Sequence, residues 1–532
     1  MLKAALIEAR AEVARVEAEA RVQRSEHHAV IVALKLEIEK YKRQLYGPSS
    51  ERIARLIDQL EFQLEEAESS ATEDELAAEK AAAAAKKIHV AASTRRPPSR
   101  KPFPAHLPRE RVVHPGPTSC PCCGGTRLSK LGEDITETLE VIPRQWKVIQ
   151  HVREKFSCRD CEKISQPPAP FHPTPRAWAG PSLLAMLAFE KFGQHQPLNR
   201  QAERYAREGV PLSVSTLADQ IGAVCTAMLP LFRLLEAHVF AGERLHGDDT
   251  TVPVLAKGKT LTGRCWVYTR DDRPFKGTAP PAAVFYYSRD RRGEHPQRHL
   301  AKWTGILQSD AYSGYNNLYD AGRSPGPVLK SLCWSHSRRK LFELADIELA
   351  ARRRARGKTA VVSPIALEAV NRINAVFDIE RDINGHTAAE RLAVRQELSV
   401  PRVLELETWM REQRAKLSRH DPVAKAFDYM LNRWTAFTEF LRDGRICLTN
   451  NAAERALRGL ALGRKSWLFA GSDRGGERTA MMYSLIVSAR MNDVDPQAWL
   501  GDVLGRIAGH PASKLAELLP WNWKSRDRSE AA

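Results

Sequence analysis

The 532-residue chain contains few cysteines and no long apolar run. Nine cysteines are too sparse for a framework of disulfide bridges, which excludes the disulfide-rich secreted class. No stretch approaches the roughly 18 uninterrupted apolar residues that a membrane span requires. Charges recur every three or four positions through residues 1–30, so no apolar segment of a secretion signal is present there. We therefore expect a cytoplasmic protein without a membrane partner.

Acidic residues are too few to balance the basic ones. The chain has 81 Lys and Arg against 64 Asp and Glu, a formal net charge of +17. This excess predicts a polyanionic partner. The 43% hydrophobic content is enough for packed cores, which excludes wholesale disorder, and the length suggests about three or four domains.

The N-terminal region is expected to be helical. Through residues 1–45 hydrophobic residues recur in alternating steps of four and three, which is typical of a coiled coil. Gly47 and Pro48 end this helix, and a second one follows. An intramolecular hairpin and a dimer zipper explain the pattern equally well. Residues 86–111 then form a basic, proline-rich linker, either a plain tether or a segment that follows DNA phosphates.

Two CxxC pairs predict a metal site in the next region. The pairs can supply four thiolates to one zinc ion, and the residues between them alternate as strands of a zinc ribbon do. The alternative, two unrelated redox pairs, lacks a thioredoxin-like context. The predicted zinc ligands are Cys120, Cys123, Cys158 and Cys161.

A helical region follows the cysteine pairs. Within it one helix, Gly209, a short turn and a second helix that Ser213 can cap succeed one another, which is the pattern of a helix-turn-helix. Helical hairpins without a role in DNA binding share this pattern, so both interpretations stay open.

After Glu243 the pattern changes to short strands. Three consecutive strand candidates precede a helical segment around His299–Trp303, and two further strands follow. This is the order of a ribonuclease-H-like fold, and it puts Asp248 in the first strand and Asp310 at the end of the fourth. Carboxylates on neighbouring strands can hold the two divalent ions, about 4 Å apart, that phosphodiester chemistry uses.

A third acid normally completes such a site, and Glu454 is the candidate. Asn450 and Asn451 can cap a helix that carries Glu454 in its first turn. Taken singly, Glu454 could be an ordinary charge at a helix N-terminus, and Asp248 or Asp249 a turn residue. The same segment also supplies a cationic rim for DNA: Arg458, Arg464 and Lys465.

Four sequence blocks resemble those of the insertion sequence 66 family of bacterial DDE transposases. They are HGDDT at 246–250, LQSDAYSGY at 307–315, CWSHSRRKL at 333–341 and NNAAERALRGLALGRKSWLFAGS at 450–472. The segment YKRQLYGPSSER at 41–52, the two CxxC pairs and the helical segment at 181–201 are also similar to the family. The resemblance therefore covers nearly the whole chain in family order.

The resemblance implies a DNA transposase that cleaves and transfers strands. Its triad would be Asp248, Asp310 and Glu454, which would bind magnesium or manganese. Where the family commonly has Asp-Glu-Thr this chain has Asp-Asp-Thr, so Asp249 is the fallback for Asp248. It also implies double-stranded DNA as a partner, a homo-oligomer that bridges two DNA ends, and possible accessory proteins from the same element.

The resemblance further assigns the long interval between the second and third acids to a helical insertion. The run Arg338, Arg339 and Lys340 is expected to contact the DNA backbone, and Arg352–Arg354 to do so or to form a solvated face. Cys333 and His336 match a CxxH element of the family, for which packing and hydrogen bonding are expected rather than catalysis or metal binding.

The overall expectation is a multidomain α+β protein. Its segments are a helical coiled-coil region at 1–85, a linker at 86–111, a zinc-binding domain at 112–175, a helical and potentially DNA-binding region at 176–242, a ribonuclease-H-like catalytic domain at 243–337 and 444–490, a helical insertion at 338–443 and a C-terminal helical tail at 491–532. Two other functions compete: a non-catalytic zinc-ribbon and helix-turn-helix DNA-binding protein, and a ribonuclease-H-like nuclease that never joins DNA.

Overall fold

The structure is a computed structural model, and it describes residues 146–150, 156–157, 164–165, 172, 179–345 and 363–523. The chain divides into two compact units, Met1–Val152 and Arg153–Ala532, and nearly all described residues belong to the second. Several predictions lie outside the described residues: the coiled coil, the basic linker, the four zinc cysteines and Arg352–Arg354. On either side of the second cysteine pair in the sequence, β1 (Phe156–Ser157) and β2 (Ile164–Ser165) form a short antiparallel ladder.

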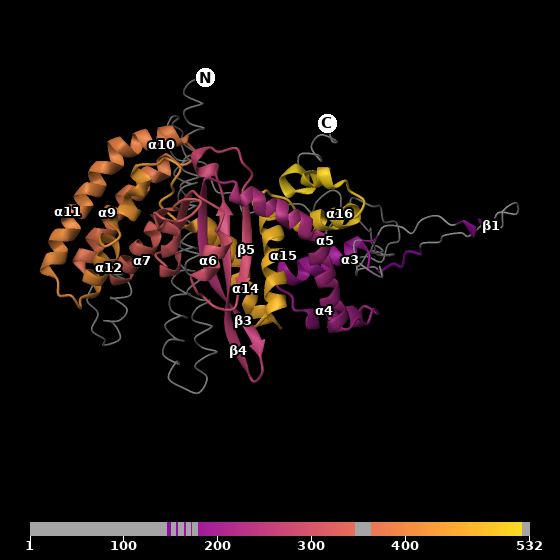
Figure 1. The fold of residues 1–532 in the computed structure, drawn as a ribbon. Coiled ribbons are helices and arrows are strands. Elements are labelled where there is room, and N and C mark those ends of the chain that lie inside the picture. The colour runs from indigo at the N-terminus through magenta and orange to yellow at the C-terminus, as the bar shows by residue number, and fades with distance from the viewer. Residues whose placement is uncertain are drawn as a thin grey trace, which may run out of the picture. The chain divides into compact units, whose positions relative to one another are not determined.

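The second unit is organised around a mixed five-stranded sheet (Figure 1). Its strands lie in the order β5-β4-β3-β6-β7. The first three along the chain form an antiparallel meander, whereas β6 and β7 continue the sheet in parallel from β3. The strands are β3 (Arg244–Ala256), β4 (Lys259–Arg270), β5 (Ala282–Ser288), β6 (Ile306–Ser309) and β7 (Leu329–Leu332). The predicted strand pattern is therefore present, and the protein is a mixed α+β protein.

The connection between β5 and β6 differs from the prediction. The helix expected around His299–Trp303 begins and ends earlier, as α6 (Glu294–His299). Leu300 and Trp303 instead pack into the core after the helix has ended. Short 3-10 helices occupy the neighbouring connections: η1 (Arg273–Phe275) and η2 (Ser313–Tyr319).

Helices far apart in the sequence cover the antiparallel end of the sheet. The helix α15 (Asp473–Met491) packs along the edge strand β5. Ser488 and Ser484 of α15 accept hydrogen bonds from the main-chain N–H groups of Ala283 and Phe285, at 3.0 and 2.8 Å. An uncovered edge strand would leave such N–H groups open to other chains. The helix α15 therefore closes this edge of the sheet.

The region N-terminal to the sheet contains three helices, α3 (Pro181–Phe192), α4 (Leu198–Arg207) and α5 (Val214–Phe240). Ser213 caps α5 as expected, because its Oγ accepts the N–H of Thr216 at 3.1 Å. Gly209, in the connecting turn, has a φ of 86°, which a glycine adopts without strain. The helices α4 and α5 thus form a helix-turn-helix in outline, and a role in reading DNA stays a prediction.

By length and composition, α5 would be apolar enough to cross a membrane, the one such helix among the described residues. In the structure it packs against β5 and α15. Leu217, Val224, Leu231 and Leu235 are among its fully buried side chains. The buried core helix of a water-soluble domain meets the same criterion, so α5 gives little support to a membrane span.

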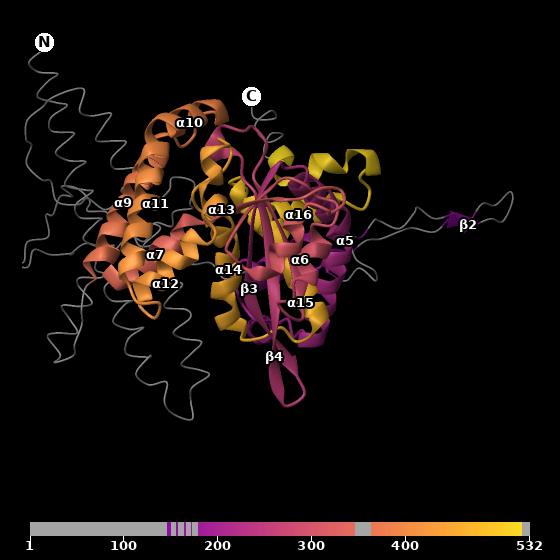
Figure 2. The same cartoon turned by 60° about the vertical axis from the view of Figure 1, so that its left-hand side comes forward.

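A helical region connects β7 to the returning chain and lies on the opposite side of the sheet from α3, α5 and α16 (Pro496–Arg506), as Figures 1 and 2 show. Its elements are α7 (Trp334–Ala345), α9 (Pro364–Asp382), α10 (Ala388–Val394), the π-helical turn η3 (Arg395–Ser399), α11 (Val400–Lys416), α12 (Pro422–Leu431), α13 (Trp434–Thr438) and η4 (Glu439–Leu441). A continuous apolar core around Trp334, Ile373 and Phe427 joins α7, α9, α11, α12, α13 and η4. The expected boundary at residue 338 falls inside α7, because this one helix begins beside the sheet and continues into the insertion.

The chain then returns to the sheet through α14 (Asn451–Trp467), which packs against β3 and β4. After α15, α16 packs against α3, and η5 (Ala512–Leu518) contacts α5. The C-terminal segment therefore packs into the same core as α3 and α5, the helices that precede the sheet.

Candidate functional site

The three predicted acids lie on three different elements. Asp248 is in the middle of β3, Asp310 directly follows β6, and Glu454 is in the first turn of α14. In the parallel pairing of β3 with β6, His246 stands opposite Gln308. Asp248 and Asp310 each follow one of these paired residues by two positions, so they occupy the same level of neighbouring strands.

The negative charges of Glu454 and Asp310 act on Asp248. The pKa of Asp248 is raised well above its ordinary value, first by burial and then by the carboxylates of Glu454 and Asp310. The positive charge of His336 acts in the opposite direction. Asp248 therefore lies in a region of concentrated negative charge, where a cation would favour its ionised form.

Asp249, the fallback for Asp248, is engaged elsewhere. Its side chain is only 2% exposed and forms ion pairs with Arg264 at 3.0 Å and Arg291 at 2.9 Å. Burial raises its pKa, and the hydrogen bond and charge of Arg291 counteract that effect. Two arginines thus already neutralise Asp249, which leaves Asp248 as the better candidate for a metal ligand.

Arg291 is a site residue that the sequence reasoning missed. It follows β5, and its Nη2 lies 3.7 Å from a carboxylate oxygen of Asp310 as well as bonding Asp249. Its guanidinium also stacks 4.2 Å from the ring centre of Tyr312. The basic run at 289–292 was the available signal, but only the fold brings it to Asp310.

The start of α14 is fixed to the sheet by buried hydrogen bonds. The Nδ2 of Asn450 donates to the main-chain oxygen of Gly247 at 3.0 Å, and its Oδ1 lies 3.3 Å from the Nδ1 of His246. Asn450 is at the N-cap position, as expected, but its side chain makes no capping bond. It is completely buried and is used to hold α14 against β3 instead.

A second link holds the same segment to β6. Gln308 is completely buried, and its side chain donates to the main-chain oxygen of Cys447 at 2.6 Å and accepts the N–H of Cys447 at 2.9 Å. Arg244 of β3 donates to Gln308 at 3.1 Å. The strands that carry Asp248 and Asp310 and the segment that leads to Glu454 are therefore bonded together two to seven residues from those acids.

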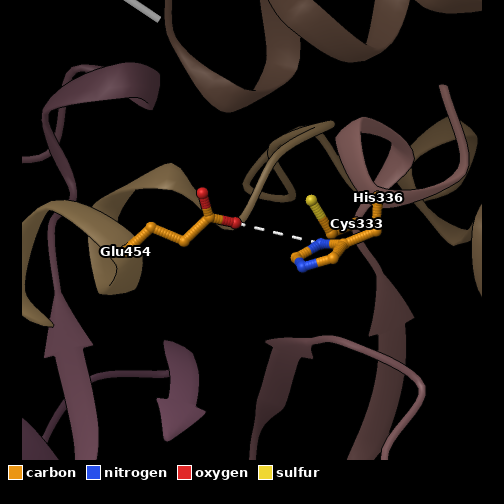
Figure 3. Close-up of side chains that lie close together, drawn as sticks. All are labelled: Cys333, His336 and Glu454. Carbon is orange, nitrogen blue, oxygen red and sulfur yellow. Dashed lines mark ion pairs between the residues drawn. The ribbon is translucent and has the colours of Figure 1, made fainter. Parts of the chain in front are cut away.

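Cys333 and His336 lie beside Glu454 (Figure 3). Cys333 directly precedes α7, and His336 is in its first turn. The Nδ1 of His336 is 3.8 Å from the Oε1 of Glu454. Burial lowers the pKa of His336, but Cys333, Glu454 and Asp248 outweigh it and raise the pKa to about 10. Their expected structural role stays a prediction, and the structure adds that they adjoin the third acid.

The cationic residues expected to bind DNA have partners within the protein. Arg338 donates to Asn374 at 2.7 Å, Arg339 pairs with Glu343 at 3.4 Å, and the Nζ of Lys340 lies 3.5 Å from the ring centre of Tyr429. The contacts of Arg338 and Lys340 hold α7 to α9 and α12, whereas the Arg339 pair lies within α7, so the run is not simply a solvated face.

The cations of α14 are likewise held by the protein. Arg464 donates to the hydroxyl of Thr250 at 3.1 Å and to the main-chain oxygen of Thr251 at 3.0 Å, and so ties the helix to β3. Burial lowers the pKa of Arg458. Arg458 and Lys465 are both half-buried on α14 and interact with other residues of the protein. DNA contact by this set stays a prediction.

Four parts of the chain match models of known protein families, and all four models describe parts of transposases. A model described as the transposase IS66 family matches residues 176–478, and a zinc-finger binding domain of transposase IS66 matches residues 117–162. Residues 33–112 match a model described as Transposase C of IS166 homeodomain, and residues 484–521 match the IS66 C-terminal element.

Curated relatives of similar length occur in Sinorhizobium fredii. The uncharacterized protein y4hP is 59% identical over 93% of this chain and 89% of its own length. The uncharacterized proteins y4qI and y4jD are 36% and 33% identical, and each alignment covers at least 94% of both chains. Because the family model spans more than half of the chain and the motif blocks lie within it, this protein belongs to the IS66 family of transposases.

Proposed function

We propose that the chain catalyses metal-dependent cleavage of DNA at transposon ends and transfer of the cut strands into target DNA. The observation that carries the proposal is the charge around Asp248, whose pKa is raised by burial and then by Glu454 and Asp310, which are 206 and 62 positions away in the sequence. An arrangement that concentrates carboxylates at such a cost in stability is typical of a functional site.

The donor set fits magnesium or manganese. Carboxylate oxygens are the ligands that these hard cations prefer, and a divalent ion would relieve the repulsion that raises the pKa of Asp248. Asp248, Asp310 and Glu454 would hold it. When bound, such ions supply positive charge that activates the attacking oxygen and stabilises the leaving oxygen of a phosphodiester.

The residues of the chain would act by positioning. Asn450 and Gln308 hold the elements that carry the three acids in fixed relation. Arg291 places a cation beside Asp310, where it can face a DNA phosphate. In the first step water attacks a phosphodiester and releases a 3′-hydroxyl end. In the second that hydroxyl attacks a target phosphodiester, so one P–O bond forms while another breaks.

The fold supports the same chemistry. The strand order β5-β4-β3-β6-β7, with three antiparallel strands followed by two parallel ones, is the arrangement expected of a ribonuclease-H-like domain. We propose that the domain boundaries follow the predicted ones, except that α7 belongs to both the sheet domain and the insertion. Zinc at the four cysteines, oligomerisation and accessory proteins complete the proposal.

The experiment is a joining assay. Purified protein, in magnesium, is mixed with DNA ends taken from the sequence that flanks its gene, with and without accessory proteins of the element. Glu454→Gln is the test variant, and Glu405→Gln, on the exposed face of α11, is the control for a lost carboxylate. We expect joined product from wild type and control, and a loss of at least about 1,000-fold in Glu454→Gln.

Each other outcome identifies a competing function. Cleavage without joining would indicate a nuclease, and bound but intact DNA would indicate a DNA-binding protein without catalysis. Joining that survives Glu454→Gln would reject Glu454 as the third acid. Thermal unfolding of each variant separates loss of chemistry from loss of fold.

A further inference from the structure

Cys333, His336 and Glu454 bring three different ligand atoms together. The sulfur, a ring nitrogen and a carboxylate oxygen all lie within 4.8 Å of one another. Cys333 and His336 are three positions apart at the start of α7, so they share one face of that turn. Glu454 faces them from α14, as Figure 3 shows. The site thus joins the two helices that flank the insertion.

The buried Nδ1 of His336 makes no hydrogen bond of ordinary geometry, and the polar groups next to the ring are the thiol of Cys333 and the carboxylate of Glu454. Its separation from the Oε1 of Glu454, 3.8 Å, is too long for a hydrogen bond. A buried polar atom without a partner is rare, and a bound ion is one explanation for it. In a tetrahedral zinc site, ligands at the usual bond lengths lie about 3.3 Å apart. A movement of roughly half an ångström would therefore bring these two atoms to ligand spacing.

The surroundings of the sulfur suit a bound anion. Cys333 is 2% exposed, and its Sγ accepts the main-chain N–H of Asn450 at 3.2 Å. That N–H belongs to the N-cap residue of α14, so the positive end of this helix dipole lies at the sulfur.

We propose that Cys333, His336 and Glu454 form a further metal site, selective for thiophilic divalent ions such as Zn²⁺. Sulfur and imidazole ligands favour zinc, whereas magnesium prefers oxygen alone. A fourth position would be open to water, as in zinc sites with three protein ligands. Because Glu454 would be shared, zinc bound here withdraws it from Asp248 and Asp310, and zinc then inhibits DNA cleavage. This consequence rests on the proposed function, whereas the binding of zinc does not.

The binding test uses the full chain without DNA. The chain is first given one equivalent of Zn²⁺, which the four-thiolate region binds preferentially because it offers more sulfur ligands, and Co²⁺ is then added as a spectroscopic probe. A thiolate bound to Co²⁺ gives an intense charge-transfer absorption in the near ultraviolet. We expect this absorption, with one further ion per chain, in wild type and in the control Cys225→Ser, which removes a buried thiol of α5.

Cys333→Ser should abolish the absorption, and His336→Gln should weaken Co²⁺ binding by at least about tenfold. An absorption that is unchanged in Cys333→Ser, or absent from wild type, would overturn the proposal. If Cys333→Ser does not fold, His336→Gln decides, because its partly exposed side chain makes it the milder change.

A second measurement addresses the shared carboxylate. Joining in magnesium is titrated with Zn²⁺, and we expect inhibition that a tenfold increase of magnesium shifts to higher zinc concentration. Inhibition that is independent of magnesium would reject the sharing of Glu454. A protein that binds Co²⁺ through Cys333 but joins no DNA would overturn the proposed function and leave the metal site standing.

Discussion

Asn450 and Gly247 are joined by a hydrogen bond of 3.0 Å across 203 positions of sequence. Gly247 precedes Asp248, and Asn450 comes four positions before Glu454. The bond therefore holds the start of α14, which carries Glu454, next to the part of β3 that carries Asp248. The side chain of Asn450 is completely buried and also reaches His246. Its position between strand and helix determines where α14 begins relative to β3.

Replacing Asn450 by alanine should therefore impair catalysis more than folding. The variant leaves the Gly247 oxygen without its partner, which costs about 1–3 kcal/mol of unfolding free energy. Because Glu454 then loses its fixed position, we expect DNA cleavage to fall by about 10- to 100-fold. Asn451→Ala, at the half-buried first position of α14, is the control. Equal cleavage by the two variants would contradict the positioning role.

The neighbouring acids Asp248 and Asp249 should respond oppositely to neutralisation. Asp248→Asn removes a charge that Glu454 and Asp310 repel, so the metal-free variant should be at least as stable as wild type at neutral pH, while cleavage is abolished. Asp249→Asn removes the partner of Arg264 and Arg291, so its unfolding free energy should fall by about 1–3 kcal/mol. This loss is smaller than for a fully buried ion pair because both arginines are partly exposed.

Urea unfolding and the cleavage assay, run on both variants, separate these effects. We expect Asp249→Asn to retain measurable metal-dependent cleavage. A variant Asp249→Asn that is fully stable yet inactive would make Asp249 the ligand instead.

A buried ion cluster holds the insertion to the chain that returns to the sheet. Arg395 and Arg391 are buried, pair with Glu380 of α9, and both donate to the main-chain oxygen of Ile446. Glu380→Gln leaves both cations buried without their counter-charge, so we expect a loss of about 3–5 kcal/mol in unfolding free energy.

The exposed pair Arg372–Glu405 on the same helical region provides the contrast. Glu405 is 69% exposed, and Glu405→Gln should change the unfolding free energy by less than about 0.5 kcal/mol. The two variants are compared by denaturant unfolding and by limited proteolysis of the insertion. A similar loss of unfolding free energy in Glu380→Gln and Glu405→Gln would show that burial does not determine how much an ion pair stabilises the fold.

His299 should make stability depend on acidity. Burial lowers its pKa from 6.5 to about 3, and its ring stacks on Tyr286 with centroids 4.3 Å apart. Because the folded pKa lies below the unfolded one, the unfolded chain binds the proton first as the pH falls. The contribution of neutral His299 to the unfolding free energy is fully present above pH 6.5. It is lost progressively from pH 6.5 towards pH 3, by at most about 1.4 kcal/mol per pH unit.

The variant His299→Phe keeps an aromatic ring against Tyr286 and removes the proton site. Its unfolding free energy should be lower than that of wild type at pH 7.5, because the hydrogen bond to Tyr268 is lost, and the difference should shrink at pH 5.5 and 4.5. Urea unfolding at the three pH values provides the test, and parallel pH dependence in the two proteins would refute it.

Local patterns in the sequence determined the elements and their order. Alternating hydrophobicity located the strands around Asp248 and Asp310, and the serine at 213 marked the start of α5 correctly. These signals depend on neighbours a few positions away, so the sequence carries them directly. The helix near His299 was placed too late, because its last residues have a helical pattern but pack into the core as a turn.

The tertiary structure decided which of these residues meet. Sequence blocks suggested Asp248, Asp310 and Glu454 as a set. The register between β3 and β6 and the hydrogen bond from Asn450 to Gly247 show how the two strands and α14 lie next to one another. The pattern alone could not separate Asp248 from Asp249. Consecutive strand residues point to opposite faces, and only the fold brings Arg264 and Arg291 to one of them.

The same distinction holds for the cations and for His336. A run of basic residues in the sequence indicates positive charge but not where each side chain points. In the structure, Arg464 donates hydrogen bonds to Thr250 and Thr251 of β3. His336 comes to lie beside Glu454 because α7 and α14 both start next to the end of β7, a consequence of long-range packing. The sequence thus determined the family and the elements. Packing between separate segments decided the contacts that would carry the chemistry, because those contacts join residues of different strands and helices.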